Sequence, residues 1–81
     1  MNNMTSIDSF KTRKYNHRNP QHGQYQIVDE GSDWIQYKLV LDKNNPQTDK
    51  VVRGLKTAGY KLNGIKKIHS DLSEYLYTYY V

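Results

Sequence analysis

One segment of the chain has helical periodicity, and it lies between segments that alternate as strands do. Its apolar residues recur at the spacing of a single helix face: Val51, Val52, Leu55 and Ala58. Asn45 suits the N-cap, and Pro46 suits the first helical position, where no amide donor is needed. Gly59 suits the left-handed residue that ends a helix. The sequence therefore predicts one helix between Asn45 and Gly59.

The segments around this helix have strand character. The clearest is "WIQYKLVLD" at 34–42, where apolar and aromatic residues alternate with period two. Segments 24–30, 60–69 and 74–81 also predict strands, and 10–18 alternates weakly, as an edge strand or an ordered arm does. We predict an α+β fold with the order (β)ββαββ. Its antiparallel sheet has four strands, or five with the weak segment, and carries the helix on one face.

Two glycines refine this prediction. Gly31 stands in "GSD" between two predicted strands and favours a hairpin. Gly64 interrupts the alternation of segment 60–69 and indicates a bulge.

The 81 residues allow one domain, which we place at 10–81 after a flexible N-terminus at 1–9. The chain has no cysteine, so disulfides and thiolate metal sites are excluded. No apolar run approaches the ~20 residues that cross a bilayer, and the first ten residues lack the pattern of a signal peptide. We expect a cytoplasmic protein without a membrane partner.

Tyrosine must supply much of the core, because aliphatic residues are scarce. The last predicted strand is aromatic on both faces, and this leaves two arrangements open. Either Tyr75, Tyr77 and Tyr79 pack under the helix while Tyr80 is exposed, or Leu76 and Tyr80 are buried. The second arrangement would leave three rings on an open sheet face, where bases of single-stranded RNA can stack.

The formal net charge of +4 comes from basic residues that cluster in two places. The first cluster is an arm with an interleaved aromatic: Lys11, Arg13, Lys14, Tyr15 and Arg18. The second follows the outer face of the helix and continues beyond it: Lys50, Arg53, Lys56, Lys61, Lys66 and Lys67. Rows of fixed cations bind phosphates, and an arginine beside an aromatic also suits a base. We predict that the arm and the helical residues Lys50, Arg53 and Lys56 bind RNA, with Tyr15 stacking on a base.

The sequence gives little support to catalysis. His17 and His22 flank a proline and lack the helical spacing of a zinc site. There is no phosphate-cradling glycine loop and no constellation of paired carboxylates. We therefore predict a non-enzymatic protein with no metal and no cofactor. A small metal-free ribonuclease, with His69 as its acid or base, is the alternative.

The stretch "VVRGLKTAGYKLNGIKKIHS" resembles the helix–strand–strand part of small HicA-type toxins, mainly through "LKTAGYKL" and a following histidine. Those toxins carry their catalytic histidine after a Gly-Ser pair, where this chain reads "KKIHSD". The resemblance implies an RNA-cleaving domain on a scaffold like that of double-stranded-RNA-binding proteins.

The whole chain is similar in character to small accessory proteins of T-even-type phages, being short, polar at its start, and rich in lysine and tyrosine. Among these it resembles the phage inhibitors of type III toxin endoribonucleases. The resemblance implies an RNA-binding inhibitor of a nuclease toxin or another host defence factor, acting in the bacterial cytoplasm. The alternative of another class is a protein-interaction module, a homodimer joined along an exposed strand edge.

Overall fold

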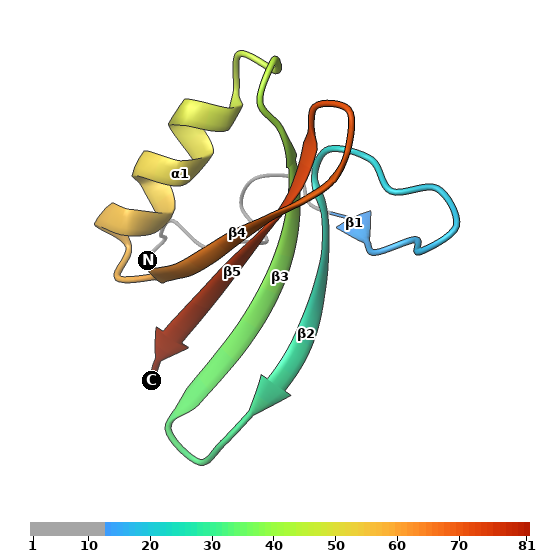
Figure 1. Cartoon of the computed structure of the whole chain (residues 1–81). Coiled ribbons are helices and arrows are strands. Elements are labelled where there is room, and N and C mark those ends of the chain that lie inside the picture. Colours follow the sequence, from blue (N-terminus) through green and yellow to red (C-terminus); the bar gives the residue numbers. More distant parts are fainter. Residues whose placement is uncertain (1–12) are drawn as a thin grey trace.

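The computed structural model describes residues 13–81, and these form one sheet with a helix on one of its faces (Figure 1). In chain order the elements are β1 Arg13–Lys14, β2 Gln24–Glu30, β3 Trp34–Asp42, α1 Thr48–Thr57, β4 Lys61–His69 and β5 Leu72–Tyr80. The predicted α+β class and (β)ββαββ order are confirmed. Segment 1–9, which we predicted to be flexible, and Lys11 lie outside the described residues. Within the described part, no helix is long and apolar enough to cross a membrane.

The sheet has the spatial order β1-β2-β3-β5-β4, which makes β3 and β5 its central strands. The three pairs among β2, β3, β5 and β4 are antiparallel, whereas β1 runs parallel to β2. The prediction of a wholly antiparallel sheet is therefore wrong at this edge. The chain between β1 and β2 is not a tight hairpin but a loop over residues 15–23, which brings β2 back to the starting end of β1 (Figure 1).

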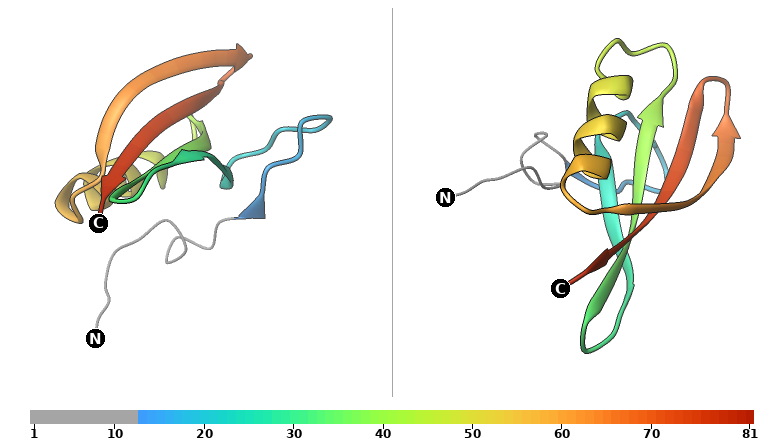
Figure 2. Two further views of the ribbon diagram at one scale, coloured as in Figure 1. Left: turned by 90° about the horizontal axis from the view of Figure 1, so that it is seen from below. Right: turned by 90° about the vertical axis from the view of Figure 1, so that its left-hand side faces the viewer.

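The helix connects two strands that are not neighbours. β3 leads into α1, α1 leads into the edge strand β4, and β5 then returns between them and pairs with β3 along its full length. The predicted bulge at Gly64 is confirmed, because the register between β4 and β5 shifts between Leu62 and Gly64. Two further views show how strongly the sheet twists, with β4 and β5 splayed away from β2 (Figure 2).

The main core lies between α1 and the sheet face that it covers. It contains Leu39, Leu41 and Tyr77 from the sheet together with Val51 and Leu55 from the helix. The predicted apolar stripe of the helix is thus confirmed. The first of the two tyrosine arrangements is also the observed one, since Tyr75 and Tyr79 pack against this core and Tyr80 is 61% exposed on the other face.

The helix ends as predicted but begins later. Gly59 has a φ of +96°, and the amide of the next residue, Tyr60, donates to the Leu55 carbonyl at 2.9 Å. At the other end α1 begins at Thr48 with Gln47 as its N-cap, so the prediction of Asn45 as N-cap and Pro46 as first helical residue is wrong by two residues. The Asn45 side chain instead accepts the Gln47 amide at 2.8 Å and shapes the turn that precedes α1.

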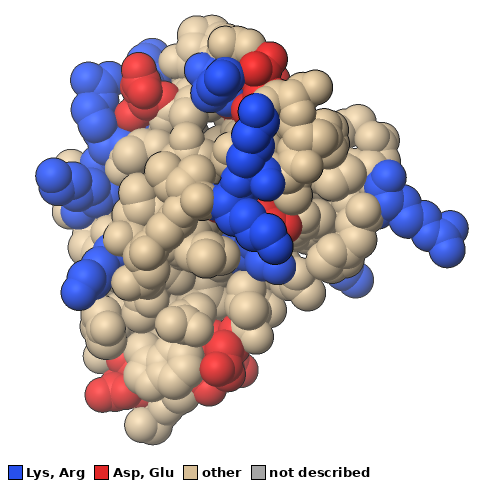
Figure 3. All heavy atoms as spheres, in the orientation of Figure 1, with Lys and Arg blue, Asp and Glu red and all other residues tan. Residues whose placement is uncertain are grey.

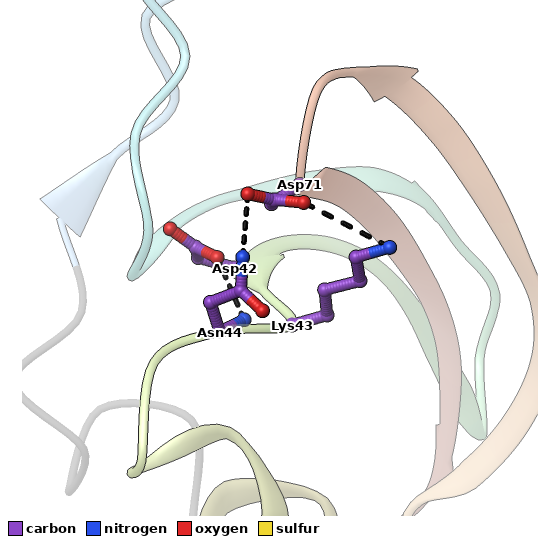
Figure 4. Close-up of polar contacts among 4 residues, drawn as sticks. All are labelled: Asp42, Lys43, Asn44 and Asp71. Atoms are coloured by element: carbon purple, nitrogen blue, oxygen red, sulfur yellow. Dashed lines mark hydrogen bonds and ion pairs between the residues drawn. The ribbon is translucent and has the colours of Figure 1, made fainter.

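The start of α1 is tied to the turn between β4 and β5 (Figure 4). Asn44 donates from its side-chain amide to Asp71 Oδ2 at 2.5 Å, and Lys43 Nζ lies 3.8 Å from the other oxygen of that carboxylate. The Thr48 hydroxyl also donates to the Asp42 carbonyl at 2.5 Å. These contacts fix where the helix starts on the sheet, and therefore where its outer face points.

Candidate nucleic-acid interface

The outer face of α1 carries a row of exposed cations that continues into β4. Lys50, Arg53 and Lys56 recur every three residues on the side opposite the buried stripe, and Lys61 opens the next strand; all four are exposed. We call these four residues the helix row. Among residues 13–81 the structure has two ion pairs, Lys38–Glu74 and Lys43–Asp71, and neither includes a member of the row. Within that part of the chain, its positive charge is not neutralised by a paired carboxylate.

Three of the seven acidic residues in the described structure gather at an end of the molecule away from the helix row, whereas Asp49 lies in the first turn of α1 beside Lys50. Asp29, Glu30 and Asp33 surround the β2–β3 turn, and all three are exposed. In the space-filling view red side chains lie at the lower end, and blue side chains lie over α1 and over the region of β4, with further red side chains among them at the upper end (Figure 3). A polyanion on the helix row would therefore lie away from the acidic β2–β3 turn, with Asp49 as the acidic residue on α1 itself.

The structure separates the predicted arm from the helix row. β1 and β4 form opposite edges of the sheet. Arg13 pairs with Gln24 and Lys14 with Tyr25, and because neighbouring strand residues alternate, the two basic side chains leave β1 on opposite faces. The Arg13 guanidinium donates to the His22 carbonyl at 3.2 Å, and Arg18 lies in the following turn. Arg13, Lys14 and Arg18 are exposed, but Arg13 and Lys14 do not share one surface.

Tyr15, which we predicted to stack on a base, has other contacts in the fold. Its ring is buried and stacks on His17, with ring centroids 4.3 Å apart. Its hydroxyl donates to Glu74 Oε2 at 2.5 Å. Burial, and secondarily this carboxylate, raise the pKa of Tyr15 to about 12. The ring thus joins the 15–23 loop to the sheet, and we leave it out of the proposed interface.

Glu74 is the residue around which this second buried region is built. The carboxylate lies on the central strand β5 and is only 6% exposed. Besides Tyr15 it meets Lys38, whose Nζ is 3.8 Å from Glu74 Oε1 and 5.9 Å from the centre of the Tyr15 ring. The sequence carries one signal of this arrangement: Glu74 is an acidic residue on a tyrosine-rich strand, on the face that points away from the helix.

The three histidines lie apart from one another: His17 stacks on the Tyr15 ring, His22 lies at the end of the 15–23 loop, and His69 lies at the end of β4. His22 Nδ1 accepts the Asp42 amide at 3.0 Å, and partial burial lowers the pKa of its imidazole. His69 is exposed at the end of β4, eight residues along the strand from Lys61 of the helix row. In the described part of the chain, no group of three or more His, Asp or Glu side chains is placed to hold a metal ion.

A pocket of about 530 Å³ adjoins the helix row, between the end of α1 and the start of β4. Lys56 and Lys61 belong to its lining, and Tyr60 and Tyr77 supply aromatic walls. Sequence analysis did not find this pocket, because it depends on how the Gly59 turn places β4 beside the helix.

No family model matches this chain, and it has no significant similarity to any curated protein or solved structure that was searched. The fold and the site together define a small α+β domain with a basic helix face.

Proposed function

We propose that this protein binds RNA without cleaving it, and that the helix row is its phosphate-binding surface. The observation that carries the proposal is the row itself: four exposed cations follow one path from α1 into β4, while the acidic turn lies elsewhere. The fold supports this use of the helix, because Val51 and Leu55 anchor its opposite side in the core. The cations therefore stand on a fixed element.

The spacing of the row suits a charged strand. Six residues separate Lys50 from Lys56, which is about 9 Å along a helix axis. Each phosphate that such a cation neutralises releases condensed counterions, so the logarithm of affinity falls with the logarithm of salt concentration by about 0.7 per contact on a single strand. Four contacts predict a slope of about −3.

A charge-reversal experiment tests the proposal against the arm. The helix variant is Lys50→Glu, Arg53→Glu, Lys56→Glu, and the arm variant Arg13→Glu, Lys14→Glu, Arg18→Glu changes net charge equally. We expect the helix variant to bind RNA at least about tenfold more weakly and with a shallower salt slope, and the arm variant to keep most of its affinity. Fluorescence anisotropy with labelled RNA measures both quantities. Equal losses would show a response to net charge alone and would contradict the assignment of the row.

The inhibitor role is the second part of the proposal, and the acidic turn supports it. A nuclease that acts on RNA has a basic surface of its own, which complements Asp29, Glu30 and Asp33. Aromatic side chains suited to a protein interface lie nearby, since Trp34 packs over Gly31 and pairs across the strands with Tyr80. We propose that this end contacts an endoribonuclease toxin or another defence factor in the bacterial cytoplasm.

Co-expression with a panel of endoribonuclease toxins tests this role. The wild-type chain is expected to restore growth against its target. The variant Asp29→Lys, Asp33→Lys is expected to lose that rescue while its RNA affinity stays the same or increases. Rescue that survives this charge reversal would remove the acidic turn from the toxin contact.

A homodimer remains the second candidate function because of one observation at the sheet edge. β4 is a nine-residue edge strand within the described sheet, and it exposes Leu62 and Ile65. Long exposed edge strands can pair with strands of another copy, although the three lysines of β4 oppose this. Light scattering after size exclusion distinguishes the two candidates. A dimer that Ile65→Lys dissociates, with partner binding insensitive to salt, would favour the interaction module.

A further inference from the structure

The pocket beside the helix row has a composition that fits a particular ligand. Its volume of about 530 Å³ lies within the range of small-molecule sites. Val52, Leu62 and the rings of Tyr60 and Tyr77 give it apolar and aromatic walls, and the exposed residues Lys56 and Lys61 also line it. A ligand that fills it would therefore need a flat or apolar body and a negative group.

Tyr77 supplies a buried donor in this lining. Tyr77 is 2% exposed, and its hydroxyl has no hydrogen-bond partner among the described residues. A buried hydroxyl without a partner is uncommon, because it loses its water without replacing it. Desolvation also raises the pKa of Tyr77 to about 12, so the hydroxyl keeps its proton at neutral pH. It remains a donor, but it has almost no exposed surface, so a ligand reaches it only when the side chains that line the pocket move aside.

We propose that the pocket accepts one unpaired base of an RNA strand, while the phosphates beside that base lie on Lys56 and Lys61. This inference rests on the proposed function and adds to it a preference for single-stranded RNA. The small exposed parts of Tyr60 and Tyr77 add to the apolar surface that Val52 and Leu62 offer to the base. When the lining moves aside, the Tyr77 hydroxyl donates to an acceptor on the edge of the base. The flanking phosphates account for the two lysines, which a purely apolar ligand would not use.

The position of the two lysines follows from the end of the helix. Lys56 is in the last turn of α1, and Lys61 begins β4 after the left-handed turn at Gly59. The turn brings both residues to the same pocket, so the helix row runs past the pocket instead of ending before it. A strand bound along the row would thus pass the place where one of its bases can turn inward.

The test compares two β4 substitutions on binding to a labelled single strand of about eight nucleotides and to a duplex of the same length. Leu62→Trp puts an indole into the pocket lining, whereas Ile65→Trp puts it on the same strand outside the lining. We expect Leu62→Trp to weaken single-strand binding about tenfold and to leave duplex binding within about twofold, since a base inside a duplex cannot enter. Ile65→Trp is expected to change neither.

A second variant changes a single atom and so avoids any question of folding. Tyr77→Phe is expected to weaken single-strand binding about fivefold, with an unchanged salt slope, because one neutral hydrogen bond to the base is lost. Leu62→Trp and Tyr77→Phe proteins that both bind a single strand as the wild type does would overturn the pocket assignment and leave the helix row standing. Failure of the wild type to bind any RNA would overturn both. Protection of the Tyr77 NMR signals by a protein partner in the absence of RNA would show that the pocket binds protein, and would also overturn the pocket assignment.

Discussion

The two faces of the sheet bury their side chains by different means. On one face, α1 covers Leu39, Leu41 and Tyr77 with aliphatic side chains of its own. On the other face no helix is present in the described structure, yet Val40, Glu74 and Thr78 are almost fully buried there. Hydrogen bonds from the 15–23 loop and from β4 hold this second face together: Tyr15 binds Glu74, and Thr78 binds Asn63.

The helix-covered face is thus stabilised by the packing of apolar side chains, whereas the other face is stabilised by hydrogen bonds between buried polar groups. Deleting carbon atoms on the helix face leaves a cavity, and the cost rises with the atoms removed. Deleting one polar atom on the other face leaves its partner buried and unpaired, so a very small change has a large effect. The following predictions test whether the two faces really differ in this way.

The largest effect is expected on the helix face. Leu55 is fully buried between α1 and the sheet, and Leu55→Ala should lower the free energy of unfolding by about 2–5 kcal/mol. Urea denaturation followed by circular dichroism measures the change. Leu62→Ala is the matched control, since Leu62 is 39% exposed and should cost less than about 1 kcal/mol. Similar losses of unfolding free energy in Leu55→Ala and Leu62→Ala would mean that packing of the helix on the sheet does not stabilise this core.

A smaller but sharper effect is expected on the polar face. Tyr15→Phe removes one oxygen and leaves the nearly buried Glu74 carboxylate without its short hydrogen bond, at a cost of about 1.5–3 kcal/mol. The same substitution at the exposed Tyr80 should cost less than about 0.5 kcal/mol. Equal stability of the two variants in urea would show that the loop, and not this contact, buries the face.

The pH dependence of stability sharpens the same contrast. The pKa of Tyr15 is about 12 in the fold and about 10 when unfolded, so its stabilising effect is complete below pH 10 and declines as the pH rises toward 12. Over that range the unfolded chain releases the Tyr15 proton first. The stability difference between wild type and Tyr15→Phe should therefore shrink between pH 9.5 and pH 11.5. A difference that stays constant over this range would indicate that the Tyr15 hydroxyl is not held as a donor.

The same contrast explains how much the sequence could predict. Strands 24–30 and 34–42 were predicted at their observed ends, because alternation and turn residues are local signals. The apolar helix stripe also predicted that one set of β5 side chains would pack under α1, but the sequence left two arrangements open, and the structure places Tyr75, Tyr77 and Tyr79 there. The residues of the helix-covered core therefore follow largely from the periodicity of apolar residues, which can be read from a single sequence.

The polar face could not be predicted in the same way. Tyr15 and Glu74 are 59 residues apart, and nothing local indicates that the loop after β1 returns to the middle of β5. The parallel pairing of β1 depends on that same loop, as does the separation of Arg13 and Lys14 from the helix row. The basic helix face was predictable because its spacing is local, whereas the pocket beside it requires the tertiary placement of β4.

The smallest effect on stability is expected where the two kinds of burial meet. Tyr77 lies in the aliphatic core but carries a hydroxyl without a partner in the described structure. Tyr77→Phe therefore removes a polar atom that stabilises nothing in the free protein, and its unfolding free energy should stay the same or rise by up to about 1 kcal/mol. Urea denaturation of the free protein gives this value, with Tyr15→Phe as the contrasting loss of a phenol oxygen. A clear destabilisation would mean that the Tyr77 hydroxyl already has a hydrogen-bond partner within the fold. The helix-covered core would then also depend on a polar contact, and the two faces would not differ as described.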